Sequence, residues 1–212
     1  MQIREENTRN LTISKVISGY SVAEYLLVLT PREDLWQTIM DIKNDFANKY
    51  RHPMASSTKP HLTLLKFVQL EAVESRILTR FATICAIQPH IKIEMKNFNT
   101  FPSHTIYINV TSKVPILNLV KALKEAQPLL KYDAAFKPYF IAEPHITIAR
   151  QLLPWQHEKA WLEYSQTSFS GRFIASKMTL LKRRIGNKFY QTVKEFSFQN
   201  QPPDSVQGYL FA

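Results

Sequence analysis

The sequence contains two short segments that carry the same pair of chemically useful side chains. PHLTL holds His61 and Thr63, and PHITI holds His145 and Thr147. Alternate residues of a β-strand lie on one face of a sheet, so each segment is expected to present an imidazole and a hydroxyl group side by side while its aliphatic residues face the core. One such motif would be weak evidence, but its repetition indicates a shared chemical role.

Two imidazoles and two hydroxyl groups suit phosphoester chemistry without a metal ion. A histidine with a pKa near 6.5 acts as a base when it is neutral and as an acid when it is protonated. One imidazole can take a proton from water or from a ribose hydroxyl while the other protonates the departing oxygen, and each such group typically raises a rate by about 10²–10⁴. The threonine hydroxyls can donate hydrogen bonds to the non-bridging phosphoryl oxygens. Because the two motifs are equivalent in sequence, which histidine is the acid stays open.

Hydrophobic periodicity indicates the elements that must position these motifs. The predicted order is strand, helix, strand, helix, strand in each of two halves, which cover about 22–102 and 103–198. Equivalent elements lie about 80 residues apart, as expected for an internal repeat. Strands are expected at 25–29, 61–67, 91–95, 106–110 and 144–150, helices at about 35–50, 73–84, 116–123 and 154–164, and a closing hairpin formed by 171–182 and 188–198.

The repeat predicts one domain over residues 21–199. Residues 1–20 are expected to form a polar N-terminal extension, and residues 200–212 a C-terminal tail. The length of 212 residues fits a single large domain or two small lobes.

Composition favours an anionic partner and excludes several classes of protein. The formal net charge of +10 points to RNA, a nucleotide or another phosphate ester. Four scattered glycines cannot form a dinucleotide-binding or P-loop motif, and the single cysteine, Cys85, excludes an internal disulfide framework. No apolar stretch is long enough to span a membrane, and the N-terminus has no secretory signal, so a cytoplasmic protein is expected.

The paired HLT and HIT motifs within a duplicated strand–helix layout resemble the two-histidine (2H) phosphoesterase superfamily, and most closely its bacterial 2′-5′ RNA ligase-like branch. The resemblance covers about residues 22–198. It implies a bilobal α+β fold in which two antiparallel sheets face each other across a central groove, with one H-x-T strand from each. Members of this family hydrolyse 2′,3′-cyclic phosphates or 2′-5′ linkages, and some join RNA ends by the reverse step.

Carried over by position, the resemblance makes His61, Thr63, His145 and Thr147 the catalytic residues. It also matches Arg150, since the second motif continues as HITIAR. The implied enzyme is a monomer that uses neither a metal ion nor another cofactor and acts on an RNA or nucleotide phosphoester. Cyclic-phosphate opening, 2′-5′ cleavage and ligation all stay open.

Several residues allow a second interpretation. In a regular strand Arg150 and Lys66 would lie on the face opposite the histidines, so Arg150 is either a phosphate clamp or a solvated cation, and a surface role is favoured for Lys66. Tyr107 and Tyr139 are expected to be exposed strand aromatics on which a base can stack, and Tyr107 is a candidate substrate-binding residue. These aromatics and the positive charge also fit a non-catalytic RNA or nucleotide binder, although binding alone needs no pair of proton-transfer groups. A zinc enzyme is disfavoured because threonine is a poor zinc ligand.

Overall fold

The structure, a computed structural model, describes residues 21–201 of the chain. The extension predicted at 1–20 and residues 202–212 of the predicted tail lie outside the described residues. The helices are α2 (Glu33–Lys49), α3 (Glu74–Ala86), α4 (Lys113–Leu123), α5 (Gln127–Leu130) and α6 (Pro154–Tyr164), with 3-10 turns η1 (Pro53–Ala55), η2 (Glu71–Val73) and η3 (Lys124–Ala126). The strands are β1 (Val22–Leu29), β2 (Leu62–Leu70), β3 (Ile91–Phe101), β4 (Thr105–Val110), β5 (Tyr139–Phe140), β6 (His145–Ala149), β7 (Ser170–Ala175), β8 (Lys177–Arg184) and β9 (Gln191–Ser197).

The predicted α+β class is confirmed, and so is the order of the main helices and strands. The longest helix, α2, follows the expected spacing of apolar residues, with Ile39 and Phe46 buried. Glu33 and Asp34 in its first turn and Lys49 in its last turn complement the helix dipole. β3 is longer than the sequence predicted, because its pairing with β4 continues as far as Phe101.

All strands join one antiparallel sheet in the order β7-β3-β4-β6-β2-β1-β8-β9, with β5 paired to β2. The sequence predicted an antiparallel sheet within each half, but the pairing crosses between the halves. β3 leaves the first half to pair with β4 and β7, and β8 leaves the second half to pair with β1. A short turn connects β3 to β4, so the two strands form a hairpin, and consecutive strands usually pair in this way.

The pairing between neighbouring strands is shortest between the two H-x-T strands. Within the described part of the chain, β2 and β6 are joined by one residue pair, Leu62 with Ile146. On either side of this seam the ladders are longer: β1 pairs with β2 over most of its length, and β4 pairs with β6 from Ile106 to Asn109. The seam therefore separates a β7-β3-β4-β6 segment from a β2-β1-β8-β9 segment.

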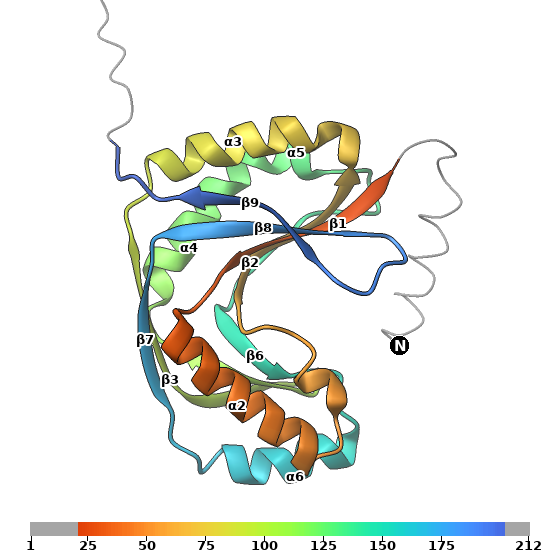
Figure 1. Cartoon of the computed structure of the whole chain (residues 1–212), viewed down its shortest axis with the longest axis vertical. Helices are drawn as coiled ribbons and strands as arrows, with labels where there is room; N and C mark the ends of the chain where they lie inside the picture. The colour runs from red at the N-terminus through yellow and green to blue at the C-terminus, as the bar shows by residue number, and fades with distance from the viewer. Residues whose placement is uncertain (1–20, 202–212) are drawn as a thin grey trace, which may run out of the picture.

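The chain also connects the two segments at their far ends. The sequence predicted a single strand over 171–182, but β7 ends at Ala175 and β8 begins at Lys177. β7 lies at one edge of the sheet and β8 lies one strand from the other edge, with Ser176 alone between them. A sheet whose two ends are joined by one residue must curl, and Figure 1 shows the bend between β7 and β8.

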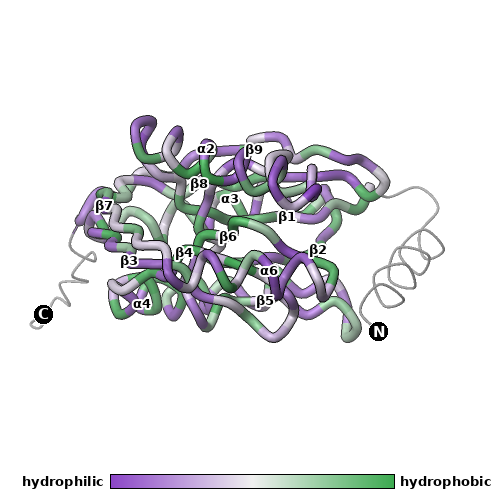
Figure 2. Tube along the Cα trace, turned by 90° about the horizontal axis from the view of Figure 1, so that it is seen from below, coloured by the Kyte–Doolittle hydropathy of each residue, from purple (hydrophilic) through white to green (hydrophobic). Residues whose placement is uncertain are grey.

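Helices pack at the two ends of this curled sheet. α3, α4 and α5 lie together at one end, against β2, β3 and β9, whereas α2 and α6 lie at the other end, near β6 and β3 (Figure 1). One continuous hydrophobic core runs through both ends and includes Leu62 and Ile146 at the seam. Figure 2 shows the hydrophobic stretches of the central strands, with hydrophilic segments toward the outside. The core therefore supports both H-x-T strands from one side.

Candidate active site

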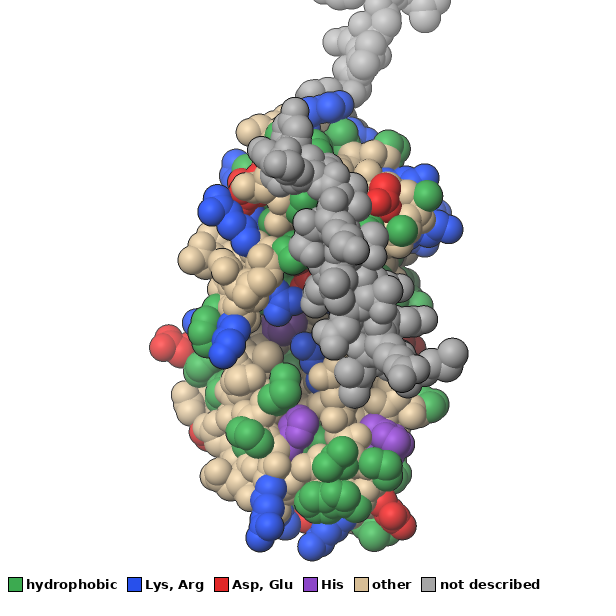
Figure 3. Space-filling view, turned by 90° about the vertical axis from the view of Figure 1, so that its right-hand side faces the viewer, with side chains coloured by type: hydrophobic (Ala, Val, Ile, Leu, Met, Phe, Trp, Pro, Cys, Tyr) green, Lys and Arg blue, Asp and Glu red, His purple; other side chains and the backbone are tan. Residues whose placement is uncertain are grey.

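The seam brings the two H-x-T motifs together. Leu62 and Ile146, the middle residues of the two motifs, pair across β2 and β6. Continuing this antiparallel register by one residue in each direction sets His61 opposite Thr147 and Thr63 opposite His145. Directly opposed side chains share a face of the sheet, so all four side chains are grouped on the face opposite the core. In Figure 3 a histidine lies in a hollow of the surface, with Lys or Arg side chains beside it.

Both histidines are held in the same way. Nδ1 of His61 lies 2.7 Å from the carbonyl oxygen of Lys59, and Nδ1 of His145 lies 2.7 Å from the carbonyl oxygen of Glu143. A carbonyl oxygen only accepts hydrogen bonds, so each Nδ1 carries a proton and donates it. Nε2 of each neutral ring is therefore the atom with a free lone pair, and the two motifs present equivalent nitrogen atoms for proton transfer.

The surroundings of the two imidazoles differ electrostatically. Burial lowers the pKa of His61 below 6.5, and the positive charges of Lys43, Arg150 and His145 lower it further, against the hydrogen bond to Lys59. Burial also lowers the pKa of His145, but its hydrogen bond to Glu143 and the carboxylate of that residue act in the opposite direction. His61 thus lies among cations, whereas His145 has a nearby anion.

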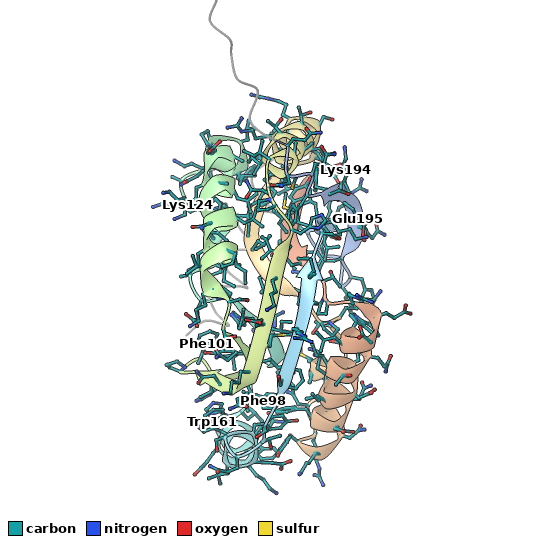
Figure 4. All side chains as sticks on the ribbon, turned by 90° about the vertical axis from the view of Figure 1, so that its left-hand side faces the viewer. Phe98, Phe101, Lys124, Trp161, Lys194 and Glu195 are labelled. Carbon is teal, nitrogen blue, oxygen red and sulfur yellow. The ribbon has the colours of Figure 1, made fainter. Side chains whose placement is uncertain are left out.

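Aromatic rings pack around His145. Its imidazole centroid is 4.9 Å from the ring of Phe101, edge to face, and 5.0 Å from the ring of Tyr107. Phe101 and Tyr107 are themselves stacked, with centroids 4.2 Å apart. Figure 4 shows Phe101 and Phe98 at the end of β3 that lies near α6. The sequence did not single out Phe101, because it lies six residues beyond the predicted end of its strand.

The expectation that Tyr107 is an exposed stacking surface is wrong. Its side chain is 3% exposed, because Phe101 and His145 cover it. Tyr107 pairs with Thr147 across β4 and β6, so it lies beside the catalytic candidates as a packing residue. Tyr139, by contrast, is exposed as expected. It pairs with Lys66 at the edge of β2 and therefore lies on the same face as that residue.

Each H-x-T strand contains an extra residue directly after its threonine. The ladder with β1 skips Leu64 of β2, and the ladder with β4 skips Ile148 of β6. A β-bulge of this kind places two consecutive side chains on one side of a strand. Leu64 and Leu65 are accordingly both buried, as are Ile148 and Ala149. The two halves thus share the bulge as well as the motif.

The bulges decide the orientation of the two cations that follow. One extra residue reverses the alternation of a strand, so Lys66 and Arg150 lie on the same side as Thr63 and Thr147. The pairing agrees, since Lys66 and Thr63 oppose Leu26 and Val28, which are two residues apart in β1. The charge of Arg150 also lowers the pKa of His61, in agreement with this orientation. The regular strand assumed from the sequence had placed both cations on the wrong face.

Lys66 and Arg150 nevertheless have different partners. Lys66 forms an ion pair with Glu24 of β1, at 3.2 Å, and Glu24 also pairs with Arg183 of β8, at 2.9 Å. The hydroxyl group of Tyr190 donates a hydrogen bond to the same carboxylate. Burial raises the pKa of Glu24, but Lys66, Tyr190 and Arg183 together hold it below its ordinary value. Glu24 therefore remains an anion that neutralises much of the charge of Lys66.

The basic run at the last hairpin is also largely paired. Lys182 forms ion pairs with Glu71 and Glu74, and Arg184 forms one with Glu71. Arg183 pairs with Glu24, so three of the four Lys and Arg side chains at this turn, Lys182, Arg183 and Arg184 but not Lys188, have carboxylate partners among the described residues. The hairpin is therefore much less positive than its sequence suggests.

Lys43 is a buried residue of the site that the sequence did not reveal. Its side chain is 1% exposed, and its Nζ donates hydrogen bonds to the carbonyl oxygens of Thr147 and Ile148 at 3.1 and 3.2 Å. A signal was present, because Lys43 lies at helical spacing between Ile39 and Phe46 on the apolar face of α2.

Other features of the described residues lie apart from the H-x-T motifs. Two pockets, of about 770 and 580 Å³, lie along β3 and β7 and between α2 and α6, and none of the candidate catalytic residues lines them. Within residues 21–201, no three or more His, Cys, Asp or Glu side chains gather to hold a metal ion, and no helix is long and apolar enough to cross a membrane. Cys85 is buried, and burial raises the pKa of its thiol to about 12, in agreement with a structural role.

Comparison with known proteins decides the family. The model of the 2′-5′ RNA ligase superfamily matches residues 31–187. This chain belongs to the 2′-5′ RNA ligase superfamily. The match spans both H-x-T motifs and both bulges, so the two motifs singled out from the sequence fall within the part of the chain that the family model covers. No curated protein sequence matches the chain significantly.

Solved structures show the same fold for this superfamily member. The structure of E. coli LigT complexed with 3′-AMP has a TM-score of 0.59 at 14% identity and covers 84% of this chain and 98% of its own. E. coli LigT complexed with NADP⁺ has a TM-score of 0.58 at 14% identity, covering 85% and 99%. TT0787 of Thermus thermophilus has a TM-score of 0.59 at 14% identity, covering 84% and 100%. The likeness extends over nearly the whole length of those proteins.

Proposed function

We propose that this chain is a metal-independent phosphodiesterase that acts on RNA ends or short oligonucleotides, at a 2′,3′-cyclic phosphate or a 2′-5′ linkage. The observation that carries the proposal is the duplicated geometry at the seam. Two imidazoles with the same Nδ1 hydrogen bond each leave Nε2 available, and each is accompanied by a threonine on the same face. Such a pair is the minimum that acid–base catalysis at a phosphodiester requires.

The electrostatic difference between the histidines supports one assignment of their roles. His61 lies near Lys43 and Arg150, which favour its neutral form, so it is the base. His145 lies near the carboxylate of Glu143, which favours its protonated form, so it is the acid.

The reaction then balances without a further group. For a cyclic phosphate, Nε2 of His61 takes a proton from water as the water oxygen bonds to phosphorus. The bond from phosphorus to one ribose oxygen breaks, and Nε2 of His145 protonates that oxygen. Thr63 and Thr147 donate hydrogen bonds to the non-bridging oxygens, where negative charge accumulates, and Arg150 stabilises that charge. Ligation would use the same groups with the 5′-hydroxyl of a second RNA end in place of water: Nε2 of His61 takes the proton of that hydroxyl as its oxygen bonds to phosphorus, and Nε2 of His145 protonates the ribose oxygen whose bond to phosphorus breaks.

Support for a nucleotide substrate comes from the residues beside the site and from the fold. Arg150 provides a cation on the catalytic face, and Tyr139 provides an exposed ring on the same face of β2. Structures of the similar E. coli LigT contain 3′-AMP and NADP⁺. A substrate with a ribose phosphate and a base would use both features.

The test is turnover of a defined panel of substrates in the presence of EDTA. Purified protein is incubated with 2′,3′-cyclic, 2′-5′-linked and 3′-5′-linked oligonucleotides, and the products are separated by chromatography. We expect conversion of a cyclic or 2′-5′ substrate that is unchanged by EDTA, because the proposed groups transfer protons themselves. Activity that is lost on chelation and restored by zinc or manganese would contradict the metal-independent mechanism. Binding without turnover, falling steeply with salt, would instead identify a non-catalytic RNA or nucleotide binder.

A further inference from the structure

Lys43 connects the two H-x-T segments through one buried ammonium group. Besides the carbonyl oxygens of Thr147 and Ile148, its Nζ bonds to the hydroxyl oxygen of Thr58 at 3.2 Å. Thr58 lies in the loop that leads into β2, three residues before His61. Ile148 is the extra residue of the bulge in β6, and Thr147 directly precedes it. The hydrogen bonds of Lys43 therefore hold both the approach to the first histidine and the bulge that turns Arg150 toward the site.

The position of Lys43 is electrostatically unfavourable within the chain alone. Lysine is rarely buried without a charged partner. Among residues 21–201, no carboxylate forms an ion pair with Lys43, and all three of its hydrogen-bond partners are uncharged oxygens. Burial lowers the pKa of Lys43 to about 8, and the nearby charge of Arg150 contributes to the same shift. The ammonium group therefore gains less stabilisation from its surroundings than it would from an anion.

The charge of Lys43 nevertheless lies close to the H-x-T residues. Its Nζ lies 3.1 Å from the carbonyl oxygen of Thr147, the residue that opposes His61, and its charge lowers the pKa of His61, as do the charges of Arg150 and His145. An anion placed between the two imidazoles would relieve the repulsion among them and would favour the charged form of each.

We propose that Lys43 is a positioning residue of the phosphate site, which fixes the bulge of β6 and the loop before His61, and that the phosphate group of the substrate is the counter-ion of its buried ammonium group. The inference rests on the proposed function for the identity of the substrate. It extends that function by assigning a residue outside both motifs to recognition of the phosphate.

The first test measures binding of inorganic phosphate, by calorimetry, to the wild-type chain and to two variants on the same helix. Lys43→Met removes the charge but keeps the length of the side chain. Lys49→Met is the matched control, because Lys49 is 57% exposed and pairs with Glu163 on the surface. We expect the dissociation constant to rise by about tenfold or more for Lys43→Met, because the attraction between a buried, weakly screened ammonium charge and the bound phosphate is lost, and by less than about twofold for Lys49→Met.

The result separates a phosphate-directed role from a purely structural one. A lower melting temperature with unchanged phosphate affinity in Lys43→Met would mean that Lys43 only supports the fold, and it would overturn the proposal. Failure of the wild-type chain to bind phosphate would overturn it as well. Because no turnover is involved, loss of phosphate affinity in Lys43→Met would support the role of Lys43 even if no substrate of the panel were cleaved.

A second measurement uses the wild-type chain, in case Lys43→Met does not fold. The lysine Cε signals are followed by NMR against pH with and without phosphate, and Lys43 is assigned from the signal that is lost in Lys43→Arg. We expect a titration midpoint near 8 that moves upward when phosphate binds, because an anion favours the ammonium form. A midpoint that does not respond to phosphate would overturn the proposal. The charged and titratable groups that interact with Lys43 are Arg150, whose charge lowers its pKa, and His61, whose own pKa Lys43 lowers.

Discussion

His61 and His145 make the same hydrogen bond, with Nδ1 lying 2.7 Å from the carbonyl oxygen of the residue two positions earlier in each case. The bond fixes the tautomer and the orientation of both rings through the backbone, before any substrate arrives. Rings that are already oriented lose little freedom when a reaction begins, which is one source of catalytic rate. The repeat has therefore duplicated the local support of each histidine along with the histidine.

Alanine at either histidine should abolish most turnover. We expect His61→Ala and His145→Ala each to lower kcat by about 10²–10⁴ on the best substrate, because each removes one proton-transfer group. The double variant should lose little more, since groups that act as a unit are non-additive. His90→Ala is the matched control, because His90 also directly precedes a strand but contacts the carbonyl oxygen of Phe198 through Nε2 instead. Wild-type turnover in both single variants would exclude the histidines as catalysts.

The pH dependence should be a bell whose maximum lies on the acid side of 6.5. Burial lowers the pKa of both histidines, so the neutral base and the protonated acid coexist only below their ordinary value. In a plot of kcat/KM against pH, the apparent pKa values of both limbs should therefore lie below about 6.5. Bound phosphate favours the protonated rings, so the profile of kcat should lie at higher pH than that of kcat/KM. Two limbs at or above pH 8 would contradict this account.

Arg150 and Lys66 should differ in importance although they hold equivalent positions after the two bulges. We expect Arg150→Met to lower kcat/KM by about 10–100-fold, as for loss of a charge-assisted hydrogen bond to phosphate. Lys66→Met should have a much smaller effect, because Glu24 already neutralises the lysine. Steady-state kinetics on one substrate would compare the two variants directly. Equal losses would show that the ion pair with Glu24 opens when substrate binds.

Phe101 should affect catalysis through the orientation of His145. Phe101→Leu removes the edge-to-face contact with the imidazole and part of the stack on Tyr107. We expect kcat to fall by about tenfold or more with little change in phosphate affinity, because a small displacement of a catalytic group is costly. Tyr107→Phe keeps the ring and removes the hydroxyl, so its kcat should stay close to wild type. A change confined to KM would contradict a positioning role for Phe101.

The sequence predicted the element order and the two motifs because both depend on local patterns. The alternation around His61 and His145 is visible in five residues, and the helices follow their apolar spacing. The sequence did not predict the bulges, although each strand contains two consecutive apolar residues, Leu-Leu in β2 and Ile-Ala in β6, that interrupt the alternation and are buried. Two consecutive apolar residues are equally typical of the end of a strand. The orientation of Arg150 could therefore be determined only from the pairing of β6 with β4.

The longer-range relationships between elements cannot be predicted from local patterns. The exchange of strands between the halves depends on which edges remain unpaired after β3 and β4 form a hairpin. The roles of Lys43 and Glu24 depend on what packs against them from residues over a hundred positions away in the sequence. Burial of Tyr107 likewise depends on Phe101, in a part of β3 that the sequence predicted to lie beyond the strand.

The exchange of strands also determines when the site can form during synthesis. β1 is among the first described elements to be made, but its second neighbour, β8, is among the last, with Val28 paired to Thr179. Until the ribosome has released that hairpin, β1 presents an open edge that can pair with another chain. Pairing over so long a stretch of chain is also slow to form. A nascent chain that stops before β8 should therefore aggregate rather than fold into a smaller active unit.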